Sequence, residues 1–184
     1  MNLLTNLISY YKLDGNSVDA VAGVNNGTNT DITYSAGNGK IVQGAGFNGS
    51  SSKIAIPSTG FPDAAEARTI AAWIYPTAID TNDFSTIFSY GTEAASQMCG
   101  WAILVDRKQN VGKYGTNASA TSGTAVTLNA WNHVAITIDA SGNIVYYLNG
   151  SADGTATLTG MDTVLSVGRI GVGINDSFAG AFIG

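Results

Sequence analysis

The chain contains a single histidine, His133, the residue type that acts most often as a general acid or base. As a general base, His133 would need a nucleophile and an orienting acid within hydrogen-bond reach. Its own stretch, AWNHVAITIDASGNIVYYLNGS from Ala130 to Ser151, does not supply that combination. We therefore expect a structural, hydrogen-bonded histidine rather than a catalyst or a metal ligand.

Glycoside hydrolysis is the enzymatic alternative, and it needs a pair of carboxylates that flank the scissile bond. The chain has two glutamates, Glu66 and Glu93, and neither falls on an alternating strand with a second acid. A pair of aspartates remains the open alternative. The sequence favours a protein without this catalytic activity, and a diverged glycan hydrolase is the third hypothesis below.

Sugar binding is a second kind of chemistry that the residue types allow. It combines an aromatic surface with a few polar groups that bond to hydroxyls. We expect Trp101, Tyr90 and Tyr114 as aromatic platforms, and the rim of the site on loops at Asn82, Asp83, Asn175 and Asp176. The structural alternative places Trp73 and Trp131 in the core or framework and Trp101 along one sheet face.

Cation binding is the third kind of chemistry that the residue types allow. The spacing Asp14-x-Asn16-x-x-Asp19 puts oxygen ligands on a glycine-containing loop, which suits Ca²⁺. The loop lacks the later bidentate glutamate of an EF-hand. The alternative use of the same residues is to bond the backbone amides of turns.

The elements that must position these residues follow from periodicity. After Trp131, apolar residues alternate at Val134, Ile136 and Ile138, which predicts a strand with these three side chains in a core. A turn and a return strand follow. Similar segments, separated by turn signals, recur along the chain; we expect strands over Leu7–Leu13, Lys40–Phe47, Ser52–Ile56, Thr69–Tyr75, Ser85–Tyr90, Gly100–Val105, 131–139, 144–149 and Val164–Gly168.

Two segments carry further expectations. Thr69–Tyr75 is continuously apolar, as a strand buried on both faces would be. Asp63–Arg68 resembles a short helix or helical turn. About ten strands in one domain of residues 1–184 predict an all-β, two-sheet antiparallel sandwich.

Composition supports this class. Hydrophobic residues make up 45% of the chain and charged residues 11%, and glycine occurs 23 times. The net charge of −5 argues against nucleic-acid binding, which relies on clustered Lys and Arg. The single cysteine, Cys99, cannot form an internal disulfide, and we expect it to be a buried small hydrophobe.

No apolar run approaches the roughly 20 residues of a membrane span, so we expect no membrane insertion. The first residues, MNLLTNLISYYKLDG, lack the basic start and long apolar centre of a signal peptide. If the protein acts outside a cell, it would leave by lysis or by assembly into a particle. We therefore expect a location on a virion or an extracellular surface.

Several motifs occur in the order seen in laminin-G-like domains of the bacterial and phage type, within the concanavalin A-like lectin/glucanase superfamily. They are Tyr11–Asn16 with Asp19 and Gly23, Ala45–Gly49, Thr69–Pro76, Trp131–Ala135 and Tyr147–Gly150. The chain resembles this family from about Leu7 to Ile183. The resemblance implies a jelly-roll of two curved sheets that recognises carbohydrate or protein surfaces.

The resemblance also implies a structural calcium between the first strand, the Phe47-Asn48-Gly49 loop and an acid on a closing strand, which adds Asn48 to the candidate ligands. The sequence stops at Gly184, where that closing strand would follow. Either the chain is truncated, or another protein chain supplies a strand at this sheet edge.

These observations favour a non-catalytic recognition module, a phage tail- or surface-associated adhesin that contacts glycan or cell-surface polysaccharide. The first alternative is a structural virion protein that decorates a capsid or tail and contacts only other proteins. The second alternative is the diverged hydrolase.

Overall fold

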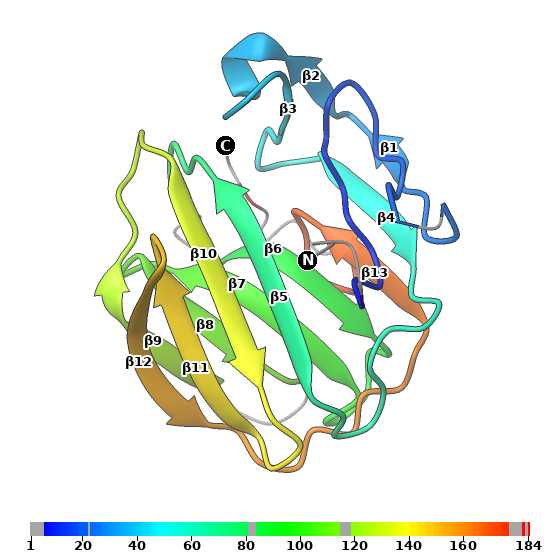
Figure 1. Cartoon of the computed structure of the whole chain (residues 1–184), viewed down its shortest axis with the longest axis vertical. Coiled ribbons are helices and arrows are strands. Elements are labelled where there is room, and N and C mark those ends of the chain that lie inside the picture. Colours follow the sequence, from blue (N-terminus) through cyan, green and yellow to red (C-terminus); the bar gives the residue numbers. More distant parts are fainter. Residues whose placement is uncertain (1–5, 22, 81–83, 115–118, 177–181, 183) are drawn as a thin grey trace.

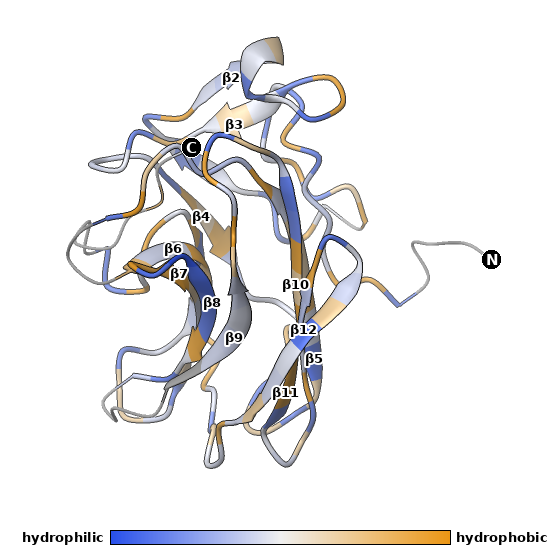
Figure 2. Ribbon diagram, turned by 90° about the vertical axis from the view of Figure 1, so that its left-hand side faces the viewer, coloured by the Kyte–Doolittle hydropathy of each residue, from blue (hydrophilic) through white to orange (hydrophobic). Residues whose placement is uncertain are grey.

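The structure, a computed structural model, describes residues 6–21, 23–80, 84–114, 119–176, 182 and 184. In these residues it contains thirteen β-strands and one short 3-10 helix, which confirms the all-β prediction. Two antiparallel sheets lie face to face as two layers, which is the predicted arrangement of a β-sandwich (Figure 1, Figure 2).

The larger sheet has seven strands in the order β1-β4-β13-β6-β7-β8-β9. Their bounds are β1 Thr28–Thr30, β4 Lys53–Pro57, β13 Val167–Ile170, β6 Phe84–Gly91, β7 Met98–Leu104, β8 Lys108–Gly112 and β9 Ser119–Ala125. The second sheet has four strands in the order β12-β11-β10-β5. Their bounds are β12 Ser151–Thr157, β11 Asn143–Leu148, β10 Asn132–Ile138 and β5 Arg68–Ile74. A hairpin of β2 (Thr33–Ser35) and β3 (Gly44–Gly46), with η1 (Ala36–Asn38) between them, lies at one end of the molecule (Figure 1).

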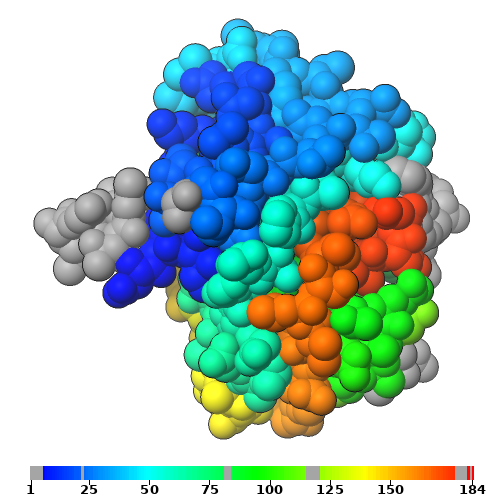
Figure 3. All heavy atoms as spheres, turned by 90° about the vertical axis from the view of Figure 1, so that its right-hand side faces the viewer, coloured from blue at the N-terminus to red at the C-terminus, as the bar shows by residue number. Residues whose placement is uncertain are grey.

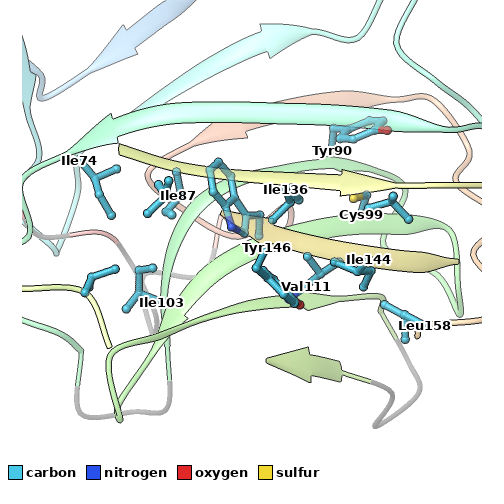
Figure 4. Packing of buried hydrophobic residues seen from close by; sticks show 14 of the residues in the cluster. Ile74, Ile87, Tyr90, Cys99, Ile103, Val111, Ile136, Ile144, Tyr146 and Leu158 are labelled. Atoms are coloured by element: carbon cyan, nitrogen blue, oxygen red, sulfur yellow. The ribbon is translucent and has the colours of Figure 1, made fainter. Parts of the chain in front are cut away.

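The core lies between the two sheets, and the predicted alternation in β10 fills it. Val134 and Ile136 are fully buried and Ile138 nearly so, as the period of two requires. They meet Ile144 and Tyr146 from β11 (Figure 4). Burying each such aliphatic side chain contributes about 1.5–3 kcal/mol relative to leaving it in water.

Arg68, at the start of β5, is a charged residue that is only 5% exposed, and it bonds to residues of the opposite sheet and of neighbouring loops. Its Nη1 donates to the hydroxyl of Tyr90 at 2.7 Å and to Oγ1 of Thr163 at 2.8 Å. Its Nε donates to the carbonyl of Glu66 at 2.9 Å, and its Nη2 donates to the carbonyl of Ala64 at 2.9 Å. The N–H groups of the buried guanidinium therefore all bond to neutral oxygens. These bonds replace the hydrogen bonds to water that a charge loses on burial.

The N-terminal half departs from the predicted strands. Leu7–Leu13 is not a strand and makes one isolated bridge, Tyr11 with Asp19. Lys40–Phe47 contains only the short β3, because Ile41 and Val42 are 90% and 59% exposed and do not pack on the core. An apolar run without a covering layer gains too little from burial to hold an extended pairing.

Asp63–Arg68, which was predicted as a short helix or helical turn, forms only a turn. The segment makes one turn, in which the N–H of Glu66 bonds to the carbonyl of Asp63 at 2.9 Å. Ala64 then pairs with Thr163 in an antiparallel bridge and has a φ of 39°, so the helix does not propagate.

The prediction that Thr69–Tyr75 is buried on both faces is also wrong. Ile74 is buried and Ile70 packs against the core, whereas Thr69 and Ala71 are exposed and Trp73 is 50% exposed. The outer face of β5 carries alanine and tryptophan, and their apolar character hides the alternation in the sequence.

Several strands were not predicted, and the predicted strand at Val164–Gly168 begins only at Val167. The missed strands are β1, β2, β8, β9 and β12. They are rich in Ser, Thr, Asn and Gly, so their pairing comes from the neighbouring strands rather than from an apolar alternation of their own.

The last described residues join the sandwich beside Phe47. Gly184 and Phe47 exchange two backbone hydrogen bonds, of 2.7 Å to the carbonyl of Gly184 and 3.2 Å to that of Phe47. Phe182 is 7% exposed and meets Phe47 edge-to-face with ring centroids 6.1 Å apart. Within the described residues, β5 pairs with β10 on one side and with no strand on the other.

Candidate functional site

Trp101 and Tyr90, two of the predicted platforms, belong to the core. Trp101 is 0% exposed and its Nε1 donates to Oε1 of Gln109 at 3.3 Å. Tyr90 is 1% exposed; its hydroxyl donates to the carbonyl of Pro62 at 3.0 Å, and burial raises its pKa. Neither ring can stack on a ligand in solution, so these two site predictions are wrong (Figure 4 shows Tyr90 inside the sandwich).

The remaining predicted residues lie elsewhere. Asn82 and Asp83 fall outside the described residues. Tyr114, Asn175 and Asp176 are described, and the structure connects the first two through an acid that the sugar-site prediction did not include. That acid is Glu93.

We call Glu93, Tyr114 and Asn175 the Tyr114 cluster. The Tyr114 ring is 39% exposed, and its hydrogen bond with the Glu93 carboxylate raises the pKa of the phenol. Nδ2 of Asn175 donates to Oε1 of the same carboxylate at 3.3 Å. All three side chains are exposed, and they come from three separate parts of the chain.

Turns at the ends of strands bring these parts together. Glu93 lies in the turn between β6 and β7, where the N–H of Thr92 bonds to the carbonyl of Gln97 at 2.9 Å. Tyr114 follows β8, and its carbonyl accepts from the N–H of Ser96 in that turn at 2.8 Å. Two turn positions are thereby fixed next to each other.

Asn175 reaches the cluster because the segment after β13 folds over the seven-stranded sheet. Oγ of Ser89 donates to the carbonyl of Val172 at 3.1 Å, and the N–H of Asp176 bonds to the carbonyl of Gly173 at 3.0 Å. In Figure 3 the red segment after β13 lies beside the green part of the chain, which includes the β6–β7 region.

Asp176 holds this segment rather than facing the cluster. Its carboxylate bonds to Nε of Arg169 at 2.6 Å and to Nζ of Lys53 at 2.9 Å. The hydrogen bond from Arg169 is the main cause of a lowered pKa for Asp176, so the carboxylate is charged at neutral pH. Asp176 is thus a positioning residue for Asn175.

The cluster offers the components that recognise a hydroxyl-rich ligand. It has the exposed face of a phenol ring, a carboxylate that accepts hydrogen bonds and an amide that both donates and accepts. Glu66, the other glutamate, accepts from the N–H of Asp63 at 3.1 Å in the loop before β5. The two glutamates therefore belong to different turns.

The predicted calcium ligands have bonds within the turns. Both carboxylate oxygens of Asp19 accept: Oδ1 from the N–H groups of Tyr10 and Val21, each at 3.0 Å, and Oδ2 from the Ser9 hydroxyl. Oδ1 of Asn48 accepts backbone N–H bonds from residues 50–52, the shortest at 2.8 Å.

Asn16 accepts from the N–H of Val18 at 3.0 Å, and Asp14 is exposed. In the described part of the chain, no three His, Cys, Asp or Glu side chains gather as they would around a metal ion. A cation at Asp19, Asn16 or Asn48 would have to share or replace these turn bonds, so the calcium site stays a prediction.

His133 and Trp73 lie side by side on the outer face of the four-stranded sheet. Their ring centroids are 5.1 Å apart in an edge-to-face contact, and Nζ of Lys40 lies 5.0 Å from the Trp73 centroid. The backbone N–H of His133 donates to Oδ1 of Asn149 at 2.9 Å. These contacts agree with a structural role for His133, whereas the half-exposed Trp73 is not a core residue.

Cys99 is buried, as predicted, at 1% exposure. Burial raises the pKa of its thiol to about 11, so the thiol is protonated at neutral pH. It is not a candidate nucleophile, since the thiolate is the reactive form.

Comparison with known proteins places this architecture. Residues 48–182 match the family described as the Concanavalin A-like lectin/glucanases superfamily, of the laminin-G type. The chain belongs to this family. None of the curated protein sequences matches it.

Solved structures with the same fold include toxin binding domains. The binding domain of Paraclostridial Mosquitocidal Protein 1 has a TM-score of 0.64 at 16% identity, and the match covers 90% of this chain and 44% of that one. The binding domain of botulinum neurotoxin DC, in complex with rat synaptotagmin II, has a TM-score of 0.65 at 15% identity, covering 88% and 42%.

A third structure comes from botulinum neurotoxin type C, whose cell entry is described as dependent upon interaction with two ganglioside molecules. It has a TM-score of 0.61 at 14% identity, covering 89% of this chain and 42% of that one. At these identities the likeness establishes the fold, and this chain spans less than half the length of each of the three. No helix in the described residues is long and apolar enough to cross a bilayer.

Proposed function

We propose that this chain is a non-catalytic recognition module that binds carbohydrate through the Tyr114 cluster. The observation that carries the proposal is the exposed Tyr114 ring, whose hydroxyl is bonded to a carboxylate that also accepts from Asn175. An exposed aromatic beside fixed polar groups suits a sugar, because one face of a sugar ring is apolar and its hydroxyls need partners.

The family and the solved relatives support recognition as the broader function. One relative is in complex with a protein receptor, and another is described as depending on gangliosides for entry. Carbohydrate is our choice between these two partner classes, because the cluster is polar and exposed rather than apolar. We place the protein at the surface of a virion or outside a cell, as a phage tail- or surface-associated adhesin.

The test is binding of the purified chain to a panel of bacterial surface polysaccharides, followed by titration calorimetry with any polysaccharide that binds. We expect saturable binding to one structural class. Absence of binding across the panel, from a chain that melts cooperatively, would instead favour the structural virion protein whose contacts are with other proteins.

A further inference from the structure

Glu93 is the acceptor at the centre of the Tyr114 cluster. The Tyr114 hydroxyl and Nδ2 of Asn175 both donate to its carboxylate. Both donors are neutral groups, so neither compensates the negative charge. The two oxygens of a carboxylate offer about four acceptor positions, and Glu93 is exposed. The carboxylate can therefore accept further hydrogen bonds from a ligand.

No lysine or arginine compensates this charge. All eight of these residues lie in the part of the chain that the structure describes, and none of the ion pairs found there includes Glu93. Lys113 comes directly before Tyr114 in the sequence. Its Nζ donates instead to the carbonyls of Thr159 and Gly160, at 2.8 and 3.0 Å.

The other charged residues around the cluster leave Glu93 without a cationic partner. On the side of Asn175, Arg169 and Lys53 bond to Asp176 at 2.6 and 2.9 Å. A further acid, Asp162, is exposed and belongs to a segment that is bonded to the β6–β7 turn. The whole chain has a net charge of −5. A charge of this sign attracts a cationic ligand and repels an acidic one over a long range.

An unpaired carboxylate beside an exposed aromatic ring suits an ammonium group. A cation within about 6 Å of a ring centroid is attracted to the face of the ring. Hydrogen bonds between ionised partners are about twice as strong as those between neutral groups. A primary ammonium has three N–H donors, so it can bond to Glu93 while the sugar that carries it packs against Tyr114. An acidic sugar would instead bring two like charges together, which is unfavourable.

From these observations we propose that the Tyr114 cluster recognises a sugar with a free amino group, such as a hexosamine that is not N-acetylated, within a surface polysaccharide. Glu93 is the residue that determines this specificity, because it bonds to the ammonium of the sugar. The same charge excludes acidic polysaccharides. This inference rests on the proposed function and adds the class of sugar to it.

The probe is an oligosaccharide of glucosamine, titrated into the whole chain by calorimetry at a mildly acidic pH that keeps its amino groups charged. The N-acetylated form of the same oligosaccharide is the matched control, because acetylation removes the charge and keeps the sugar backbone. An oligosaccharide of glucuronate tests the exclusion of acidic sugars. We expect saturable binding of the glucosamine form that weakens at high salt, binding of the N-acetylated form that is about tenfold weaker or less, and none of the acidic form.

Glu93→Gln tests the charge of the carboxylate by itself. Glutamine has the same shape and still offers an oxygen to Tyr114 and Asn175, so the variant keeps the cluster and removes its charge. Glu66→Gln is the matched control, because it removes the same charge from another turn, where Glu66 accepts from the N–H of Asp63.

We expect Glu93→Gln to weaken binding of the glucosamine oligosaccharide by about tenfold and to remove its salt dependence. This factor is the difference between a hydrogen bond to a charged group and one to a neutral group. Glu66→Gln should bind like the unchanged chain.

The outcomes distinguish the class of sugar from the proposed function. The amino-sugar proposal is overturned if the glucosamine oligosaccharide does not bind, if its N-acetylated form binds equally well, or if a folded Glu93→Gln protein binds in full. If a neutral or acidic polysaccharide of the panel then binds and Tyr114→Ala abolishes that binding, the carbohydrate site remains and only the class of sugar is wrong. If no glycan binds, both proposals fail.

A peptide with several lysines is the second source of ammonium groups, and it has its own signature. If an oligolysine peptide binds as tightly as the glucosamine oligosaccharide and Glu93→Gln weakens both, the site recognises ammonium groups of a protein, and the amino-sugar proposal is overturned. Weak binding of the peptide that Glu93→Gln leaves unchanged supports it.

Discussion

Replacing Arg68 with methionine should destabilise the fold more than any other arginine substitution in the described chain. The guanidinium is 5% exposed and joins three separate parts of the molecule: the loop before β5, Tyr90 on β6 and Thr163. Methionine has a similar length and is apolar, so Arg68→Met removes the donors with little change in packing volume.

The expected cost follows from the bonds that are lost. A hydrogen bond to a charged group is worth about 1.5–3 kcal/mol, but bonds made by one side chain do not add independently. Tyr90 keeps its bond to the carbonyl of Pro62, whereas the carbonyls of Ala64 and Glu66 lose a donor. We expect a loss of about 3 kcal/mol, the worth of one or two such bonds, because the remaining acceptors are neutral and no charge is left buried.

Urea unfolding followed by tryptophan fluorescence measures this loss from the midpoint at constant slope. Arg169→Met is the matched control, because Arg169 also bonds to a partner, Asp176, which lies at the surface with 35% of its side chain exposed. The pair is partly buried, with 14% of the Arg169 side chain exposed, but Asp176 keeps its bond to Lys53, so we expect Arg169→Met to cost about 1 kcal/mol. If Arg68→Met costs no more than Arg169→Met, the guanidinium does not stabilise the sandwich and our reasoning is refuted.

Three further predictions test the chemistry of single groups. Cys99, whose thiol pKa burial raises to about 11, should resist iodoacetamide at pH 8 in the folded chain and react once urea unfolds it; equal rates in both states would contradict its burial. The bond from Arg169 lowers the pKa of Asp176, so its contribution to the free energy of unfolding is complete above the unfolded pKa of about 4 and is lost as the pH falls through the folded pKa. Asp176→Asn should therefore lower the free energy of unfolding by less than about 1 kcal/mol and should flatten the acid side of a pH profile of urea midpoints. If the predicted calcium site exists, calcium should raise the melting temperature over that in chelator and Asp19→Asn should abolish the rise, whereas equal melting temperatures leave these residues as turn caps.

The strands that could be predicted are those whose apolar residues alternate or run together. β10 and β11 could be predicted because each places one apolar face against the core. Val134 and Ile136 of β10 and Ile144 of β11 are fully buried. β12, with the sequence SADGTAT, could not be predicted, because its place is fixed by pairing with β11 across a bulge rather than by its own side chains. The prediction of a strand at Leu7–Leu13 was wrong for the opposite reason. The segment is apolar, but Leu7, Ile8 and Tyr10 are exposed and are not held against the core.

The candidate site was harder to predict than the fold. Residue type alone cannot tell a buried aromatic from an exposed one. Trp101, predicted as an exposed platform, is buried, whereas Trp73, expected in the core or framework, is half exposed. Tyr114 was predicted as an exposed aromatic platform and Asn175 as a loop residue of the rim, and both lie in exposed turns, but Glu93 was considered only as a catalytic acid. Its contact with Asn175 depends on a chain segment folding back across the sheet, and no local pattern encodes that contact.

Calorimetric titration of Tyr114→Ala, beside the unchanged chain and Tyr10→Ala, tests the proposed function most directly, with a polysaccharide that binds in the panel. Tyr10 is 45% exposed and Tyr114 is 39% exposed, so the two substitutions remove similar rings from different surfaces. We predict that Tyr114→Ala weakens binding by about tenfold or more, as loss of a central aromatic contact does, while Tyr10→Ala binds like the unchanged chain. Unchanged binding by a folded Tyr114→Ala protein would contradict the assignment of the Tyr114 cluster as the carbohydrate site.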